Sequence, residues 1–224
     1  MTSRHAPKSR FVCQLAFLLA AVFTLAAAST AQDWIRTGTG LGVEKIRLAA
    51  SDFKASTSDA KNAVMLTTFN DTLWNDLDNA GIFEMVSKSF YPLQSPGQPS
   101  DVNFSAWNSP PPKATMLAFG NLGVTADKVA VQGWLYDLNN QASPQVLGKQ
   151  YGDSATNDAV RVIAHKFADE IIFRLGGGIP GIAESKIYFV KEMRPGVKEI
   201  WMMDYDGANQ TQITHLGAIS LSPR

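Results

Sequence analysis

The chain has 224 residues, of which 45% are apolar and 18% charged, and its formal net charge is zero. This length and composition predict one or two globular domains with a sizeable core and exclude a disordered chain. Arg4, Lys8 and Arg10 lie in the first ten residues, so the rest of the chain is mildly acidic. No basic stripe remains that would indicate nucleic-acid binding.

Residues 1–31 have the pattern of a cleaved secretory signal. A basic stretch is followed by an apolar run from Phe11 to about Ala28, and small residues precede Gln32. We expect cleavage after Ala31, with Ala28 as the alternative site, and an uncleaved membrane anchor is the competing interpretation. The single cysteine, Cys13, lies inside the apolar run, so the mature chain is expected to have no disulfide, thiol nucleophile or thiolate metal site.

Residues 32–43 are predicted to form a flexible N-terminal arm. The segment QDWIRTGTGLGV is rich in glycine and threonine and shows no helical or strand periodicity. Trp34 and Ile35 are its apolar residues. They either pack back on the following domain or belong to a docking segment that becomes ordered on a partner, and the residues alone leave both options open.

Residues 44–176 predict an α+β domain that begins with a strand, a helix and a second strand. The strand covers residues 45–50, and a Ser/Thr/Asp cluster at 56–59 supplies candidate caps for a helix over 60–80. Gly81 suits the C-terminal cap, and a short strand follows at 83–87. Short connections of this kind predict a parallel pair of strands.

The rest of this domain is predicted to contain a meander and a second helix. Prolines between 90 and 112 indicate a surface excursion, with a helical turn around 102–107. Strands over 114–122, 128–137 and 145–151 are joined by hairpin-length connections, and a helix over 157–175 carries a wide apolar stripe. The expected architecture is therefore a mixed five-stranded sheet with two helices packed on it.

A glycine-rich linker, 177–185, leads to a small β unit at 186–224. Pro195-Gly196 and Asp206-Gly207 predict two turns that join three strands, the last over 210–214. Apolar residues are consecutive in the first two strands, so both faces of this sheet are expected to need covering. Radially stacked neighbours would provide that cover, which predicts an incomplete first blade of a β-propeller.

The sequence offers little that suggests catalysis or metal binding. The mature chain has His165 and His215 as its imidazoles, and we expect both to be solvated or to have capping roles. Glu199, Asp204 and Asp206 form an acidic trio that could surround calcium, although aspartates at a turn more often bind the backbone. No Gly-x-Ser-x-Gly elbow occurs. We therefore predict a protein that is not an enzyme and has no cofactor or metal.

Three stretches resemble the TolB family of periplasmic propeller proteins of the Tol-Pal cell-envelope system. They are FNDTLWNDLDNAGIF at 69–83, HKFADEI at 165–171 with GIPGI at 178–182, and EIWMMDYDGAN at 199–209, which is the most specific. The resemblance covers the N-terminal domain and the opening of the propeller.

The resemblance implies a non-enzymatic periplasmic protein that supports outer-membrane integrity and envelope constriction at cell division. It also implies that the arm engages the inner-membrane protein TolA through residues Gln32, Asp33, Trp34, Ile35 and Arg36. The lipoprotein Pal would dock only on a complete propeller. A different class of function remains open, in which the α+β domain binds a small ligand as a secreted module and the β tail pairs with another protein.

Overall fold

The computed structural model describes residues 45–221. The predicted signal at 1–31 and the predicted arm at 32–43, including Gln32 to Arg36, lie outside the described residues. Between residues 45 and 221, no helix is both long enough and apolar enough to cross a bilayer.

The large sheet has the order β3-β1-β4-β5-β6, and β2 also pairs with β4. Strand β1 is parallel to both β3 and β4, while β4, β5 and β6 form an antiparallel meander. The predicted parallel pair and meander are thus confirmed. The strands are β1 (Ile46–Ala50), β2 (Lys54–Ala55), β3 (Phe83–Met85), β4 (Met116–Thr125), β5 (Lys128–Asp137) and β6 (Gln145–Ser154).

The prediction of five strands was wrong, because the sheet has a sixth. After β1 the chain returns to the same side of β4, where Lys54 and Ala55 pair with Asn121 and Leu122. A strand of two residues is too short to produce an alternating sequence pattern, so periodicity could not reveal it.

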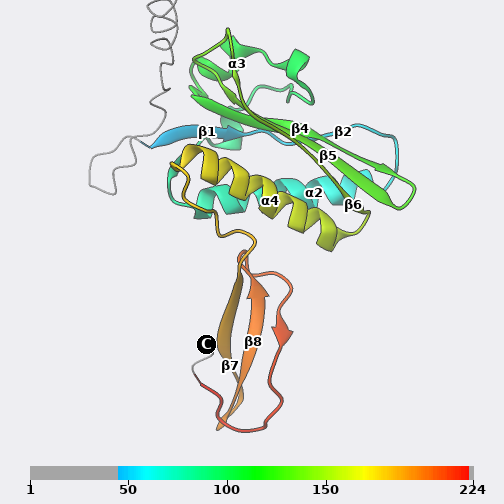
Figure 1. The fold of residues 1–224 in the computed structure, drawn as a ribbon, viewed down its shortest axis with the longest axis vertical. Coiled ribbons are helices and arrows are strands. Elements are labelled where there is room, and N and C mark those ends of the chain that lie inside the picture. The colour runs from blue at the N-terminus through cyan, green and yellow to red at the C-terminus, as the bar shows by residue number, and fades with distance from the viewer. Residues whose placement is uncertain (1–44, 222–224) are drawn as a thin grey trace, which may run out of the picture. The chain divides into compact units, whose positions relative to one another are not determined.

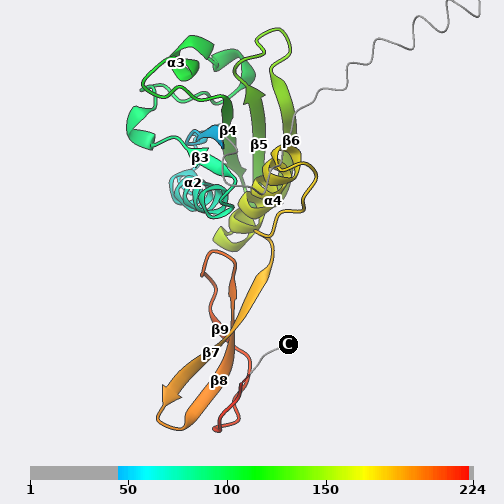
Figure 2. The same cartoon turned by 90° about the vertical axis from the view of Figure 1, so that its left-hand side faces the viewer.

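Helices α2 (Asn62–Asn79) and α4 (Asn157–Leu175) cover one face of the large sheet, as Figures 1 and 2 show. Their apolar stripes share a core with the sheet that includes Leu48, Phe69 and Phe167, all fully buried. Gly133 makes the approach of α4 possible, since a Cβ there would lie 2.7 Å from the Phe167 ring. Both helices match the predicted ranges closely, and Gly81 follows α2 with a φ of 70°, as a C-terminal cap requires.

The proline-rich segment covers the opposite face of the sheet, where Figure 1 shows the short helix α3 (Phe104–Asn108). Trp107 is 1% exposed and belongs to a second core that includes Leu117 and Phe119 of β4. The predicted helical turn is confirmed. The segment is nevertheless not only a surface excursion, because it buries the face of the sheet that the two long helices leave uncovered.

The C-terminal sheet consists of β7 (Lys186–Arg194), β8 (Val197–Asp204) and β9 (Thr211–Gln212). The strands are antiparallel, and Gly196 and Gly207 occupy the turns with positive φ, so the predicted meander is confirmed. Pairing of Tyr188 with Met202 and of Phe189 with Trp201 places apolar side chains on each face.

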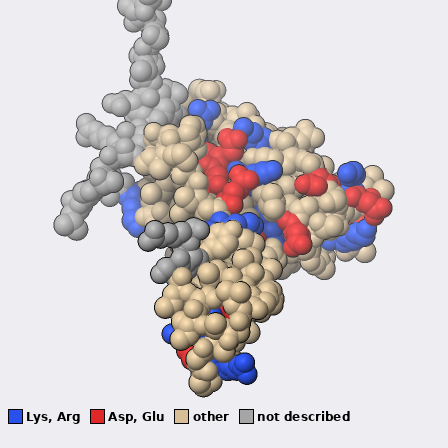
Figure 3. Space-filling view, turned by 60° about the horizontal axis from the view of Figure 1, so that its bottom comes forward, with Lys and Arg blue, Asp and Glu red and all other residues tan. Residues whose placement is uncertain are grey.

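This C-terminal sheet has no apolar core of its own in the described part of the chain. None of its hydrophobic residues is buried, and Tyr188 is 53% exposed, whereas Glu199 and Asp204 are buried. Figure 3 shows that the visible surface over this sheet is mostly uncharged. Apolar side chains on both faces that are exposed or only partly buried agree with the pattern of a propeller blade, and that assignment stays a prediction.

Candidate interaction site between helix α4 and the C-terminal sheet

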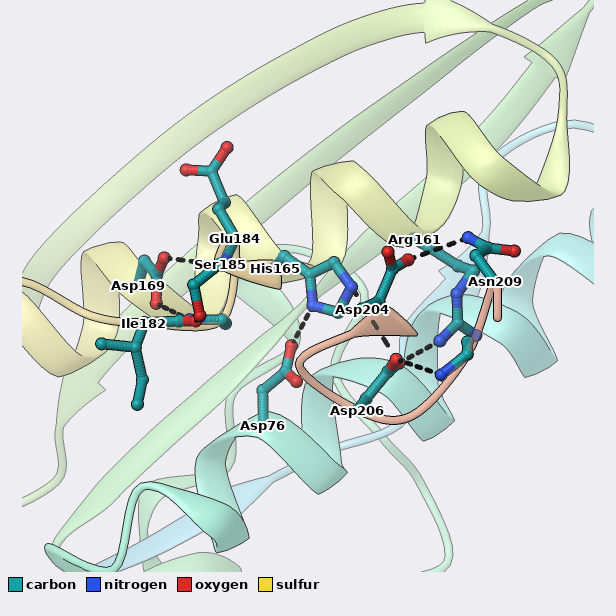
Figure 4. A network of polar contacts seen from close by, with 12 residues as sticks. Asp76, Arg161, His165, Asp169, Ile182, Glu184, Ser185, Asp204, Asp206 and Asn209 are labelled. Atoms are coloured by element: carbon teal, nitrogen blue, oxygen red, sulfur yellow. Dashed lines mark hydrogen bonds and ion pairs between the residues drawn. The ribbon is translucent and has the colours of Figure 1, made fainter. Parts of the chain in front are cut away.

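Three polar residues of α4 are spaced four apart, at Arg161, His165 and Asp169. This spacing places them in one row on the helix, beside the apolar stripe. Each contacts a different part of the chain: the C-terminal sheet, helix α2 and the linker, respectively (Figure 4). We call these three residues the polar row.

His165 is buried against α2. Its Nδ1 lies 2.7 Å from Oδ2 of Asp76, and the two side chains are 4% and 0% exposed. The prediction that His165 is solvated or has a capping role was therefore wrong. Although the residue lies beside the apolar stripe, helix α2 packs along this side of α4 and supplies a carboxylate within hydrogen-bond distance of Nδ1.

The surroundings of His165 favour its protonated form. Burial lowers the pKa of His165, but the hydrogen bond and charge of Asp76, together with the charge of Asp206, outweigh this effect and raise it above its ordinary value. Burial also raises the pKa of Asp76. The pair as a whole therefore holds its proton more tightly than the same groups would in water.

Asp206 joins the C-terminal sheet to the polar row. It lies in the turn between β8 and β9, its side chain is 5% exposed, and it forms an ion pair with Arg161. The same carboxylate oxygen, Oδ2, lies 3.9 Å from Nε2 of His165. Nε2 is buried and has no hydrogen-bond partner within the described residues, so the carboxylate faces it without a close contact.

Asp169 fixes the linker at the other end of the row. Its Oδ1 accepts a hydrogen bond from the backbone N–H of Ala183 at 2.9 Å, and its Oδ2 accepts one from Glu184 at 3.2 Å. Gly181 allows this approach, because a Cβ there would come within 2.0 Å of Asp169 Oδ1. The glycine in the linker is therefore required for close contact with α4.

The acidic trio suggested for calcium does not form a site. Asp204 contacts Lys186 and accepts a hydrogen bond from Asn209 Nδ2 at 2.8 Å. Glu199 instead accepts hydrogen bonds from Thr214 Oγ1 and from the Gly217 backbone N–H, the latter at 2.7 Å. These two carboxylates serve separate turns, while Asp206 faces α4. His215 is exposed.

Asp76, His165 and Asp206 are close enough to be considered as metal ligands. However, the imidazole stands between the two carboxylates, with Nδ1 toward Asp76 and Nε2 toward Asp206 (Figure 4). The three ligand atoms therefore do not converge on one point, and Arg161 already pairs with Asp206. This geometry suits an imidazolium between two carboxylates better than a tetrahedral metal.

The sequence-based predictions did not include Asp76, although two features of the sequence indicate the junction. Asp76 lies within the apolar stripe of α2, between Leu73 and Leu77, where a carboxylate needs a buried partner. The spacing of the polar row also indicates a contact surface along α4. The pairing of Asp76 with His165 depends on how two helices pack, and the two residues are 89 positions apart in the sequence. Residue spacing alone therefore could not predict this pair.

Comparisons with known proteins show similarity to one family, TolB. Residues 39–143 match the family model of the TolB amino-terminal domain. The chain is 34% identical over 185 residues to the Tol-Pal system protein TolB of Ruegeria sp., an alignment that covers 81% of this chain and 40% of that protein. It is 30% identical over 193 residues to that of Geobacter metallireducens, covering 86% of this chain and 43% of the relative.

The fold is similar to that of a solved structure, the crystal structure of TolB from Acinetobacter baumannii. The TM-score is 0.58 at 21% identity, and the match covers 76% of this chain and 38% of that one. The chain thus spans less than half the length of these relatives.

Proposed function

Because this chain belongs to the TolB family through its amino-terminal domain, we propose that it is a non-enzymatic protein-interaction component of the Tol-Pal system in the periplasm. In this role it supports outer-membrane integrity and envelope constriction at cell division. The observation that carries the proposal is the match of residues 39–143 to the TolB amino-terminal domain.

The junction supports a role in binding rather than catalysis. Of the two histidines in residues 45–221, His165 is buried. Its Nε2 is withdrawn from solvent and faces Asp206, which pairs with Arg161, so a substrate has no access to it. General acid-base catalysis needs a group within hydrogen-bond reach of a bound substrate. The exposed apolar residues of the C-terminal sheet, in contrast, provide surface for contacts with another protein segment.

The proposed organisation follows the sequence predictions. Residues 1–31 direct export and are removed, residues 32–43 form the arm, and residues 44–176 form the α+β domain. Residues 177–185 link this domain to a first propeller blade at 186–224. The arm binds TolA through residues 32–36, and Pal binds only where further blades complete the propeller.

The experiment is a calorimetric titration of TolA with the mature chain, residues 32–224, and with a variant that lacks 32–36. We expect the full arm to bind and the deletion to lose at least about tenfold in affinity, since Trp34 and Ile35 supply its apolar contacts. Replacement of Thr37 and Thr39 by alanine is the control and should leave affinity unchanged. Equal binding by the deletion variant would rule out the arm as the TolA site.

A further inference from the structure

We propose that Asp206 and the polar row of α4 form a latch, which holds the C-terminal sheet on the helix when His165 is protonated and releases it when His165 is neutral. The latch consists of Asp206 on the sheet, Arg161 and His165 on α4, and Asp76 on α2. It is a conformational device separate from the proposed binding of TolA, and its test needs no partner protein.

The C-terminal sheet lacks a buried apolar anchor on the helices. No hydrophobic residue from 186 to 221 is fully buried, and those of the strands are exposed or partly buried, so the sheet places no buried apolar side chain against the helices. Among the described residues, the side-chain polar contacts of α4 with the linker and the C-terminal sheet are those of Arg161 and His165 with Asp206 and of Asp169 with the linker. Asp169 fixes the linker, which leaves Asp206 to fix the sheet.

The presence of a hydrogen on Nε2 decides whether His165 and Asp206 attract each other. An ionised Asp76 only accepts hydrogen bonds, so Nδ1 of His165 must carry a proton. A neutral imidazole with that tautomer presents the Nε2 lone pair to the Asp206 carboxylate, which is repulsive. A protonated imidazole presents an N–H instead, and the 3.9 Å separation from Asp206 Oδ2 becomes attractive.

The charges at the junction are balanced only when His165 is protonated. His165 has four charged neighbours. Asp76 lies on α2, Asp204 and Asp206 lie on the C-terminal sheet, and Arg161 lies on α4. Lys186 pairs with Asp204, so its charge is already matched. When His165 is protonated, the positive charges of Arg161 and His165 balance the negative charges of Asp206 and Asp76. When the ring is neutral, one buried negative charge is in excess.

The raised pKa of His165 agrees with this arrangement, since Asp76 and Asp206 outweigh the effect of burial on the ring. Release of the sheet removes the contribution of Asp206. By linkage, the open state therefore has a lower His165 pKa than the closed state, and rising pH favours opening.

The test measures the distance between helix and sheet in the full chain by double electron-electron resonance. Spin labels are attached at Lys166→Cys and Gln210→Cys, both exposed positions, in a Cys13→Ser background. We expect one narrow distance distribution at about pH 5.5 and a broad one at about pH 8.5, with the ratio of closed to open molecules falling at least about fivefold.

Three variants separate the latch from general effects on folding. Asp206→Asn should give the broad distribution at both pH values, and His165→Gln should remove the pH dependence. Glu192→Gln, which removes an exposed charge from the same sheet, should behave like the parent chain. Circular dichroism and the Tm of the α+β domain show whether each variant is folded. A parent distribution that is the same at both pH values, or a folded Asp206→Asn variant that stays closed, would overturn the proposal.

Discussion

The buried pair of Asp76 and His165 joins the two long helices by a polar contact inside an otherwise apolar interface. Both side chains are almost completely withdrawn from water. Removal of one partner from such a pair leaves an uncompensated buried group and typically costs about 3–5 kcal/mol. The raised pKa of Asp76 reduces this cost where the carboxyl can take up a proton.

We predict that the free energy of unfolding decreases as pH rises through neutrality. The pKa of His165 is higher in the folded chain than in the unfolded one, so its stabilising contribution is complete below about pH 6.5 and is lost as pH passes the folded value. The raised pKa of Asp76 also lowers stability as pH rises, starting above its ordinary value of 3.8. Urea unfolding between about pH 6 and about pH 8.5 measures the effect.

His165→Gln is the variant that assigns this pH dependence. It should weaken the dependence and lower stability by about 3 kcal/mol near pH 6, because the cation that faces Asp76 is lost. His215→Gln, at an exposed histidine, is the matched control and should change neither quantity. If His165→Gln retained the parent dependence, the titrating group would lie elsewhere.

Strong periodic patterns predicted the long helices and strands, whereas short elements were not predicted. The stripe on 157–175 gave the bounds of α4, and Pro195-Gly196 gave the turn between β7 and β8. Strand β2 was missed because two residues carry no periodicity. The burial of Trp107 was missed because prolines indicate only that a segment is irregular, not what it covers.

The segment that carries α3 should contribute to stability through Trp107. Trp107→Ala is expected to lower the free energy of unfolding by about 3–5 kcal/mol, since the side chain is 1% exposed in the second core. Leu93→Ala in the same segment is the control, as Leu93 is fully exposed. Guanidinium unfolding distinguishes them, and a cost below about 1 kcal/mol for Trp107→Ala would show that the segment is only loosely attached.

In the molecule as a whole, the strands and turns of the C-terminal sheet were predicted well from local patterns. The contacts within this sheet, however, do not explain how it is stabilised. Its strands and turns follow from short-range signals, yet Tyr188 and Met193 are exposed and its other apolar side chains are at most partly buried. The polar contacts of Asp206 with α4 depend on tertiary packing and could not be predicted from residue spacing alone. A propeller blade flanked by neighbours would bury both faces, which is the interpretation we propose.

We propose that this chain performs the role of the amino-terminal part of TolB. Its most direct test is a chimera in which the aligned segment of the Ruegeria protein is replaced by residues 32–221 of this chain. The chimera is expressed in cells that lack TolB, and the detergent concentration that inhibits growth is measured. We predict recovery of at least half of the resistance given by the unaltered relative, and little recovery when residues 32–36 are deleted. A chimera that is exported and folded at the normal level but leaves the cells as sensitive as those without TolB would contradict the claim.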